Sequence, residues 1–208
     1  MRTLRILTYA APVAALVAAC HGKTPTNPPA PTGQPLATAA ASSVVAPVAS
    51  PPPAPAPSAP TEITVTLEAR SGSKLAGTAV LTAVDGGVKV VLKVTGAPPG
   101  KVGTHVHEKD DCSAPDAKSA GGHFNPANHP HGLPDGERHL GDLGNIEVGK
   151  DGTGSHEIVV KGATLVAGEP NSFVGRSIIV HEKQDDGGQP VGNAGGRIGC
   201  GVIHLPGG

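Results

Sequence analysis

The sequence has very few aromatic residues. Among its 208 residues there is no Trp, one Tyr and only two Phe. A core in this chain must therefore be built mainly from Val, Ile, Leu and Ala. The chain also lacks an excess of charge of either sign, since its formal net charge is -1 at pH 7. This balance argues against nucleic acid as a partner.

No hydrophobic run is long enough to span a membrane comfortably. A short apolar segment follows Arg2 and Arg5 and ends in small residues, which is typical of a secretory signal peptide over residues 1–19. The sequence Val-Ala-Ala-Cys that ends at Cys20 resembles a bacterial lipobox. The resemblance implies cleavage before Cys20 and a lipid on its sulfur. The alternative is an ordinary signal peptide that is cut nearby, with Cys20 free or removed.

From the lipobox we expect a lipoprotein of the bacterial cell envelope, on the periplasmic side. The lipid on Cys20 would be its only contact with a membrane. Residue 21 is His rather than the Asp that often keeps such lipoproteins at the inner membrane, so the outer membrane is favoured.

Residues 20–60 and 61–208 differ in composition. The segment that follows Cys20 is rich in Pro and Ala and cannot bury enough apolar surface to order itself. It is predicted to be a disordered tether. Residues 61–208 carry nearly all of the charged residues, Gly and His, and they are numerous enough for one domain with its own core.

Alternating apolar and polar residues predict strands throughout this domain. The predicted strands are 61–70, 75–84, 88–94, a segment through His105 and His107, 144–149, 154–161, 177–183 and 198–204. Between them, residues 110–143 and the Gly-rich 184–196 show no periodicity, and loops this long are usually functional. The pattern favours an all-β antiparallel sandwich or barrel.

His105 and His107 occur two residues apart on one predicted strand. Positions i and i+2 of a strand point to the same face, so both imidazoles project to one side while Val106 faces a core. Two imidazoles on a stiff strand form half of a metal site, and other segments must supply the rest.

Five motifs occur in order along residues 61–208. They are Thr-His-Val-His-Glu (104–108), Gly-Gly-His-Phe-Asn-Pro (121–126), Glu-Arg-His-Leu-Gly-Asp-Leu-Gly-Asn (137–145), Gly-Arg-Ser-Ile-Ile-Val-His-Glu-Lys (175–183) and Gly-Asn-Ala-Gly-Gly-Arg-Ile-Gly-Cys-Gly (192–201). Together they resemble the copper-zinc superoxide dismutase family. The resemblance implies an eight-stranded Greek-key antiparallel barrel with long metal-binding and active-site loops.

The resemblance also implies two metal sites. The implied copper ligands are His105, His107, His123 and His181, and the implied zinc ligands are His123, His131, His139 and Asp142. His123 would bridge a redox-cycling copper and a structural zinc, and as a catalytic residue it would help to deliver a proton to form hydrogen peroxide. The implied activity is dismutation of superoxide to oxygen and hydrogen peroxide, which would protect the cell envelope. A non-catalytic copper/zinc-binding or copper-delivery lipoprotein of the same fold is the alternative.

Further roles follow from the resemblance. Arg197 would dock the superoxide anion near copper, and Asp185 would link a copper-bound to a zinc-bound histidine. Cys112 and Cys200 would form an intrasubunit disulfide. Lys118 is a candidate to steer the anion, with a solvated surface lysine as the alternative.

The four remaining histidines lie outside this set. His129 is a rival of His131 for zinc, although family spacing selects His131. His21, His156 and His204 are expected at the surface. The sequence leaves monomer and homodimer both open.

Overall fold

The computed structural model describes residues 61–207. The predicted signal peptide and tether, with Cys20 and His21, lie outside the described residues. Within residues 61–207 no helix is long and apolar enough to cross a membrane.

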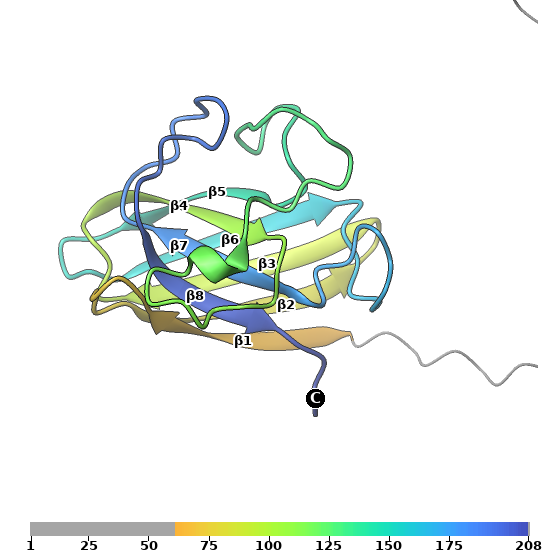
Figure 1. The fold of residues 1–208 in the computed structure, drawn as a ribbon, viewed down its shortest axis with the longest axis horizontal. Helices are drawn as coiled ribbons and strands as arrows, with labels where there is room; N and C mark the ends of the chain where they lie inside the picture. Colours follow the sequence, from red (N-terminus) through yellow and green to blue (C-terminus); the bar gives the residue numbers. More distant parts are fainter. Residues whose placement is uncertain (1–60, 208) are drawn as a thin grey trace, which may run out of the picture. The chain divides into compact units, whose positions relative to one another are not determined.

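Eight strands build the fold (Figure 1). They are β1 (Glu62–Ala69), β2 (Ala76–Val84), β3 (Gly87–Thr95), β4 (Gly100–His107), β5 (Asp142–Val148), β6 (Gly154–Lys161), β7 (Arg176–His181) and β8 (Arg197–Ile203). They close into a barrel in the order β1-β2-β3-β6-β5-β4-β7-β8, and neighbours pair antiparallel. The steps from β3 to β6 and from β4 to β7 skip sequence neighbours, as in a Greek key. The predicted all-β antiparallel barrel is confirmed.

Aliphatic side chains fill the barrel, because each strand points alternate residues inward. On β1, Ile63, Val65 and Leu67 are buried, while the residues between them are exposed. On β4, Val106 is fully buried in the same core, on the opposite face from His105 and His107. The barrel thus fixes both imidazoles on the outside of a rigid wall.

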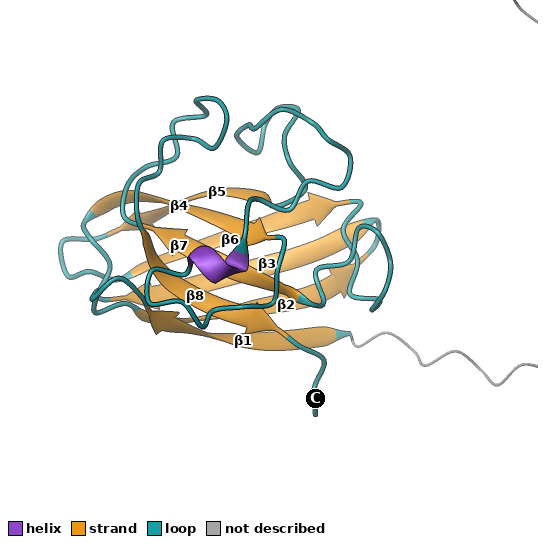
Figure 2. Ribbon diagram, viewed as in Figure 1, coloured by secondary structure: helices purple, strands orange, loops and turns teal. Residues whose placement is uncertain are grey.

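Two long loops cover that outer face. The first joins β4 to β5 through residues 108–141 and contains the 3-10 turn η1 (Lys118–Ala120). The second joins β7 to β8 through residues 182–196. The later part of the first loop and the whole second loop rise from the same side of the barrel (Figures 1 and 2), and hydrogen bonds between residues 131 and 189 join them.

The strand ends next to these loops differ from the predicted ones. The strand predicted at 144–149 begins at Asp142, and the strand predicted at 177–183 ends at His181. Register shifts occur between Thr104 and His105 and between Val180 and His181. Such β-bulges re-aim a side chain beside a functional site, and a period-two pattern does not reveal them.

Candidate metal centre

Four imidazoles converge on the outer face of the barrel. His105 and His107 come from β4, His181 from the last position of β7, and His123 from the first loop, where it bridges to His107. One ring nitrogen from each lies within 4.8 Å of the others. The period-two spacing on β4 therefore does place two imidazoles at one point.

The two ring nitrogens of three of these histidines have different surroundings. The outer nitrogen is paired in each ring: His105 Nε2 lies 2.9 Å from Asp185 Oδ2, His107 Nδ1 lies 3.0 Å from Gly121 O, and His181 Nδ1 lies 3.2 Å from Gly195 O. Because these partners only accept, the paired nitrogen carries the proton. The inner nitrogen of each ring therefore has a free lone pair.

These inner nitrogens have no partner among the described residues. His105 Nδ1, His107 Nε2 and His181 Nε2 are all buried without a hydrogen bond. A buried polar atom without a partner destabilises a fold by about 1–3 kcal/mol. Three such atoms that face one another fit a metal ion, and an all-imidazole donor set suits copper.

Burial keeps these rings neutral. It lowers the pKa of His105 to about 4, since the Asp185 hydrogen bond offsets it only in part, and the pKa of His181 to about 3. Burial, followed by the nearby His123 and Arg197, also lowers the pKa of His107 well below its ordinary value. At neutral pH the lone pairs are thus available to a metal.

A second group of donors surrounds the buried carboxylate of Asp142. His123 Nδ1 lies 2.9 Å from Asp142 Oδ1, His139 Nδ1 lies 3.2 Å from the same oxygen, and His131 Nδ1 lies 2.9 Å from Asp142 Oδ2. The His131 contact is not aligned as a hydrogen bond. Burial alone would raise the pKa of Asp142, but hydrogen bonds from His123 and the Gly132 N–H hold it below its usual value.

The distances between donor atoms are not enough to select the predicted zinc set. The second group of ligand atoms that all lie within 4.8 Å of one another comes from His105, His123, His131 and Asp142, and it leaves out His139. His139 is nevertheless buried and reaches Asp142. His123 belongs to both groups. Its Nδ1 faces Asp142, so its Nε2 is the atom left for the first group.

Asp185 connects the two groups from the second loop. Its Oδ2 accepts from His105 Nε2 at 2.9 Å and its Oδ1 from His131 Nε2 at 3.0 Å. Burial would raise the pKa of Asp185, but these two hydrogen bonds, with His105 first, hold it far below its usual value. One ionised carboxylate therefore fixes the ring and the tautomer of a histidine in each group.

Arg197, the first residue of β8, lies beside the first group. Its Nη1 donates to Ala117 O at 2.8 Å and its Nη2 to Gly121 O at 2.7 Å. Gly121 O also accepts from His107 Nδ1. Arg197 and His107 thus share one acceptor, which fixes the half-buried guanidinium relative to the imidazole cluster.

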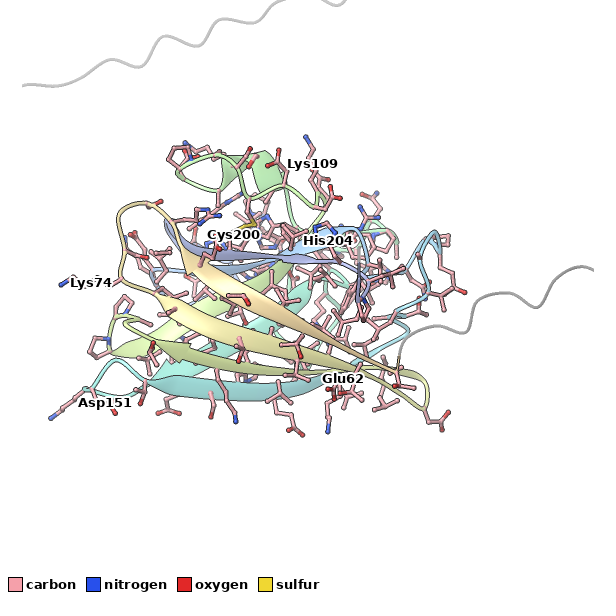
Figure 3. All side chains as sticks on the ribbon, turned by 90° about the horizontal axis from the view of Figure 1, so that it is seen from below. Glu62, Lys74, Lys109, Asp151, Cys200 and His204 are labelled. Atoms are coloured by element: carbon pink, nitrogen blue, oxygen red, sulfur yellow. A yellow bond between two sulfur atoms is a disulfide. The ribbon has the colours of Figure 1, made fainter. Side chains whose placement is uncertain are left out.

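A disulfide pins the loop segment that carries these carbonyls. Cys112 and Cys200 are bonded, with their Cα atoms 5.9 Å apart (Figure 3, which labels Cys200). Ala117 and Ala120 pack against Ile179 and Cys200 in a small buried cluster. The predicted disulfide is therefore present, and it joins the first loop to β8 three residues beyond Arg197.

Four other residues considered from the sequence lie outside the two groups. His129 is exposed, pairs with Glu137 at 2.8 Å and joins neither group. The Lys118 side chain is 80% exposed and pairs with Asp116 at 2.8 Å. His204 is exposed as expected, but His156 is not simply a surface residue: it is half-buried, and its Nε2 donates to Leu143 O at 2.8 Å.

Sequence reasoning gave no role to two carboxamides near the centre. Asn145 bonds in both directions to the main chain of Asp185, and Gln189 does the same to His131. Asn145 closes one of the five motifs, which was the available signal. Gln189 lies in no motif, and nothing local in the sequence indicates its contact.

Comparison with known proteins agrees with this geometry. The sequence model of the copper/zinc superoxide dismutase family matches residues 75–203. A solved structure of a SOD-like protein from Bacillus subtilis is 37% identical, with a TM-score of 0.60, and the match covers 67% of this chain and 97% of that chain. The structure of a double mutant of a SOD-like protein from Bacillus subtilis is also 37% identical, covers 68% and 97%, and has a TM-score of 0.61. The structure of the clock protein EA4 is 38% identical, with a TM-score of 0.64 and coverage of 71% and 96%. The chain belongs to the copper/zinc superoxide dismutase family.

Proposed function

We propose that this protein is an enzyme that dismutates superoxide: two superoxide anions and two protons give one oxygen and one hydrogen peroxide. The observation that carries the proposal is the set of three buried, unpartnered imidazole nitrogens of His105, His107 and His181 beside the anchored guanidinium of Arg197. A redox metal bound by these nitrogens and a fixed positive charge next to it are what a one-electron reaction of a small anion requires.

The two donor groups correspond to the two metals that family membership implies. His105, His107, His123 and His181 would hold copper, and His123, His131, His139 and Asp142 would hold zinc. We assign His139 rather than His105 to zinc because both nitrogens of His105 are already committed, Nδ1 to the first group and Nε2 to Asp185. Copper would supply a one-electron redox couple, and zinc a fixed positive charge.

The chain's own residues have distinct tasks in this reaction. The Arg197 guanidinium attracts and orients superoxide beside the copper group. Nε2 of His123 is the ring atom that can hold a proton between the two groups, because Nδ1 faces Asp142. Asp185 keeps the proton of His105 and of His131 on Nε2, so that each Nδ1 remains a ligand atom.

We further propose that the enzyme acts on the periplasmic side of the cell envelope, anchored through lipid on Cys20. The lipobox-like sequence before Cys20 and the Pro- and Ala-rich segment after it support this location. Mass spectrometry of Cys20 in the isolated protein tests the anchor, since an unmodified Cys20, or its removal, would contradict it.

The decisive experiment measures superoxide dismutation by the full-length protein loaded with copper and zinc. We expect fast, salt-sensitive activity in the wild type and none in His181→Ala. Arg197→Ala should be about 10- to 100-fold slower, because focusing of an anion by a local positive charge changes rates on this scale. Arg197→Lys keeps the charge but not the fork of two hydrogen bonds, so it should fall between wild type and Arg197→Ala.

The same experiment separates the enzyme from the non-catalytic alternative. A protein that binds both metals but barely dismutates superoxide would be a copper carrier or buffer. In that case Arg197→Ala would leave the measured rate unchanged.

A further inference from the structure

The two long loops are joined at His131 by the side chain of Gln189. The main-chain N–H of His131 donates to Gln189 Oε1 at 3.2 Å, and Gln189 Nε2 donates to His131 O at 2.7 Å. One carboxamide therefore occupies both hydrogen-bonding groups of a single peptide residue, as a neighbouring strand would. No described strand contains His131.

The imidazole of His131 needs an accurately placed main chain. The ring is buried, its Nδ1 faces Asp142, and its Nε2 donates to Asp185. A ring with partners at both nitrogens tolerates little rotation, so a shift of the backbone that carries it moves Nδ1 away from Asp142. The loop around His131 contains no repeating hydrogen bonds to resist such a shift.

A second carboxamide, that of Asn145, holds the main chain of Asp185 in the same way. Asn145, on β5, bonds to the main-chain N–H and C=O of Asp185 at 2.8 and 2.9 Å. Asp185 then fixes the ring of His131, and Gln189, from the same loop, fixes its main chain. The second loop also packs closely against these two side chains at Gly192. A Cβ added at this position would collide with Asp185 Oδ1 and would lie 2.6 Å from His131 Nε2.

We propose that Gln189 is a positioning residue for the zinc half of the metal centre, through its paired hydrogen bonds to the main chain of His131. The inference rests on the proposed role of His131 as a zinc ligand. Gln189 itself touches no metal-ligating atom. Asn145 binds the second loop to the barrel, and Gln189 in that loop then fixes the main chain of His131 in the first loop.

The test compares Gln189→Met with Gln184→Met in the full-length protein loaded with copper and zinc. Met has nearly the length of Gln but forms neither hydrogen bond. Gln184 is an exposed residue of the same loop and serves as the matched control. The readouts are the rates at which a chelator removes zinc and copper, and the visible spectrum of Co²⁺ bound in place of zinc.

We expect Gln189→Met to release zinc about tenfold faster, at the low end of the effect of residues that orient metal ligands, because the Gln189 side chain is exposed to competing water. Its Co²⁺ spectrum should change, while copper release should match the control.

Equal zinc release from the Gln189 and Gln184 variants would overturn the inference and leave the proposed function intact. So would equally accelerated loss of both metals. A wild type that retains copper but no zinc would instead refute the zinc half of the proposed function, and the inference with it.

Discussion

The two halves of the metal centre depend on different parts of the fold. In the half that we propose for copper (the copper half), His105, His107 and His181 lie on barrel strands. In the half that we propose for zinc (the zinc half), His131 and His139 lie in a loop, and only Asp142 begins a strand. The copper half therefore derives its geometry from the strand ladder, whereas the zinc half derives it from hydrogen bonds made by individual side chains.

The same contrast extends to the donor atoms. The inner nitrogens of the copper half are buried and unpartnered, so without a metal they destabilise the fold. In the zinc half, Nδ1 of His123 and of His139 bonds to Asp142 Oδ1, and only His131 Nδ1, 2.9 Å from Asp142 Oδ2, has no aligned hydrogen bond. The barrel strands hold the unpartnered nitrogens of the copper half together, whereas the histidines of the zinc half surround the charged side chain of Asp142.

The largest effect should come from removing one strand-borne ligand. We expect His107→Ala to reduce dismutation to background, because it deletes a donor and frees the carbonyl of Gly121 that Arg197 also uses. Zinc content should remain, since His107 makes no contact with Asp142. The paired variant His139→Ala should lose zinc and keep copper. Metal analysis and a dismutation assay on both variants check this, and simultaneous loss of both metals from each would show that the two halves are not separable.

The same division explains what the sequence could predict. The strand-borne pair His105 and His107 follows from period-two spacing alone, because a strand fixes the direction of its side chains. The loop-borne His131 and His139 could be selected only through family resemblance, since a loop has no period. Gln189 escaped prediction altogether, because a side-chain bond to a backbone 58 residues away leaves no local pattern.

Low pH should destabilise the metal-free protein, because the buried histidines of the copper half resist protonation in the folded state. The pKa of His105 is lowered to about 4 and that of His181 to about 3 by burial, against about 6.5 in an unfolded chain. Between these values the unfolded state binds more protons, so stability falls as pH decreases from about 6.5 towards 4, by up to about 1.4 kcal/mol per pH unit for each such histidine.

Urea unfolding of metal-free protein from pH 8 to 4 measures this loss. The metal-loaded protein in the same buffers is the control, and its decline should begin at lower pH because the metal competes with protons for the same lone pairs. A metal-free midpoint that stays constant between pH 7 and 5 would contradict the buried, neutral state of these rings.

Removing the disulfide tests whether Arg197 is positioned by the first loop or by strand β8. Cys112 and Cys200 are 88 residues apart in sequence, so their bond stabilises the fold by about 4.6 kcal/mol through loss of chain entropy in the unfolded state. We expect the Cys112→Ser, Cys200→Ser double variant to lose stability on this scale. Its dismutation should also fall, because the loop carries the carbonyls of Ala117 and Gly121 that anchor Arg197. A fully active, destabilised variant would show that β8 alone positions Arg197.

The smallest and sharpest effect concerns Asp185, which contacts both halves with equal geometry. In Asp185→Asn one carboxylate oxygen becomes an NH₂ group, so the side chain can accept from only one of His105 and His131. His105 keeps its place on β4 without this bond, whereas the ring of His131 stands in a loop and loses the contact that orients it. Zinc affinity should therefore fall about 10- to 100-fold, and copper affinity less.

The matched control is Asp186→Asn, which changes an exposed carboxylate in the same loop and should alter neither affinity. Competition titrations with chelators measure both affinities. A loss confined to copper would mean that the strand ladder does not protect the copper half and that the loop holds His131 in place without this carboxylate.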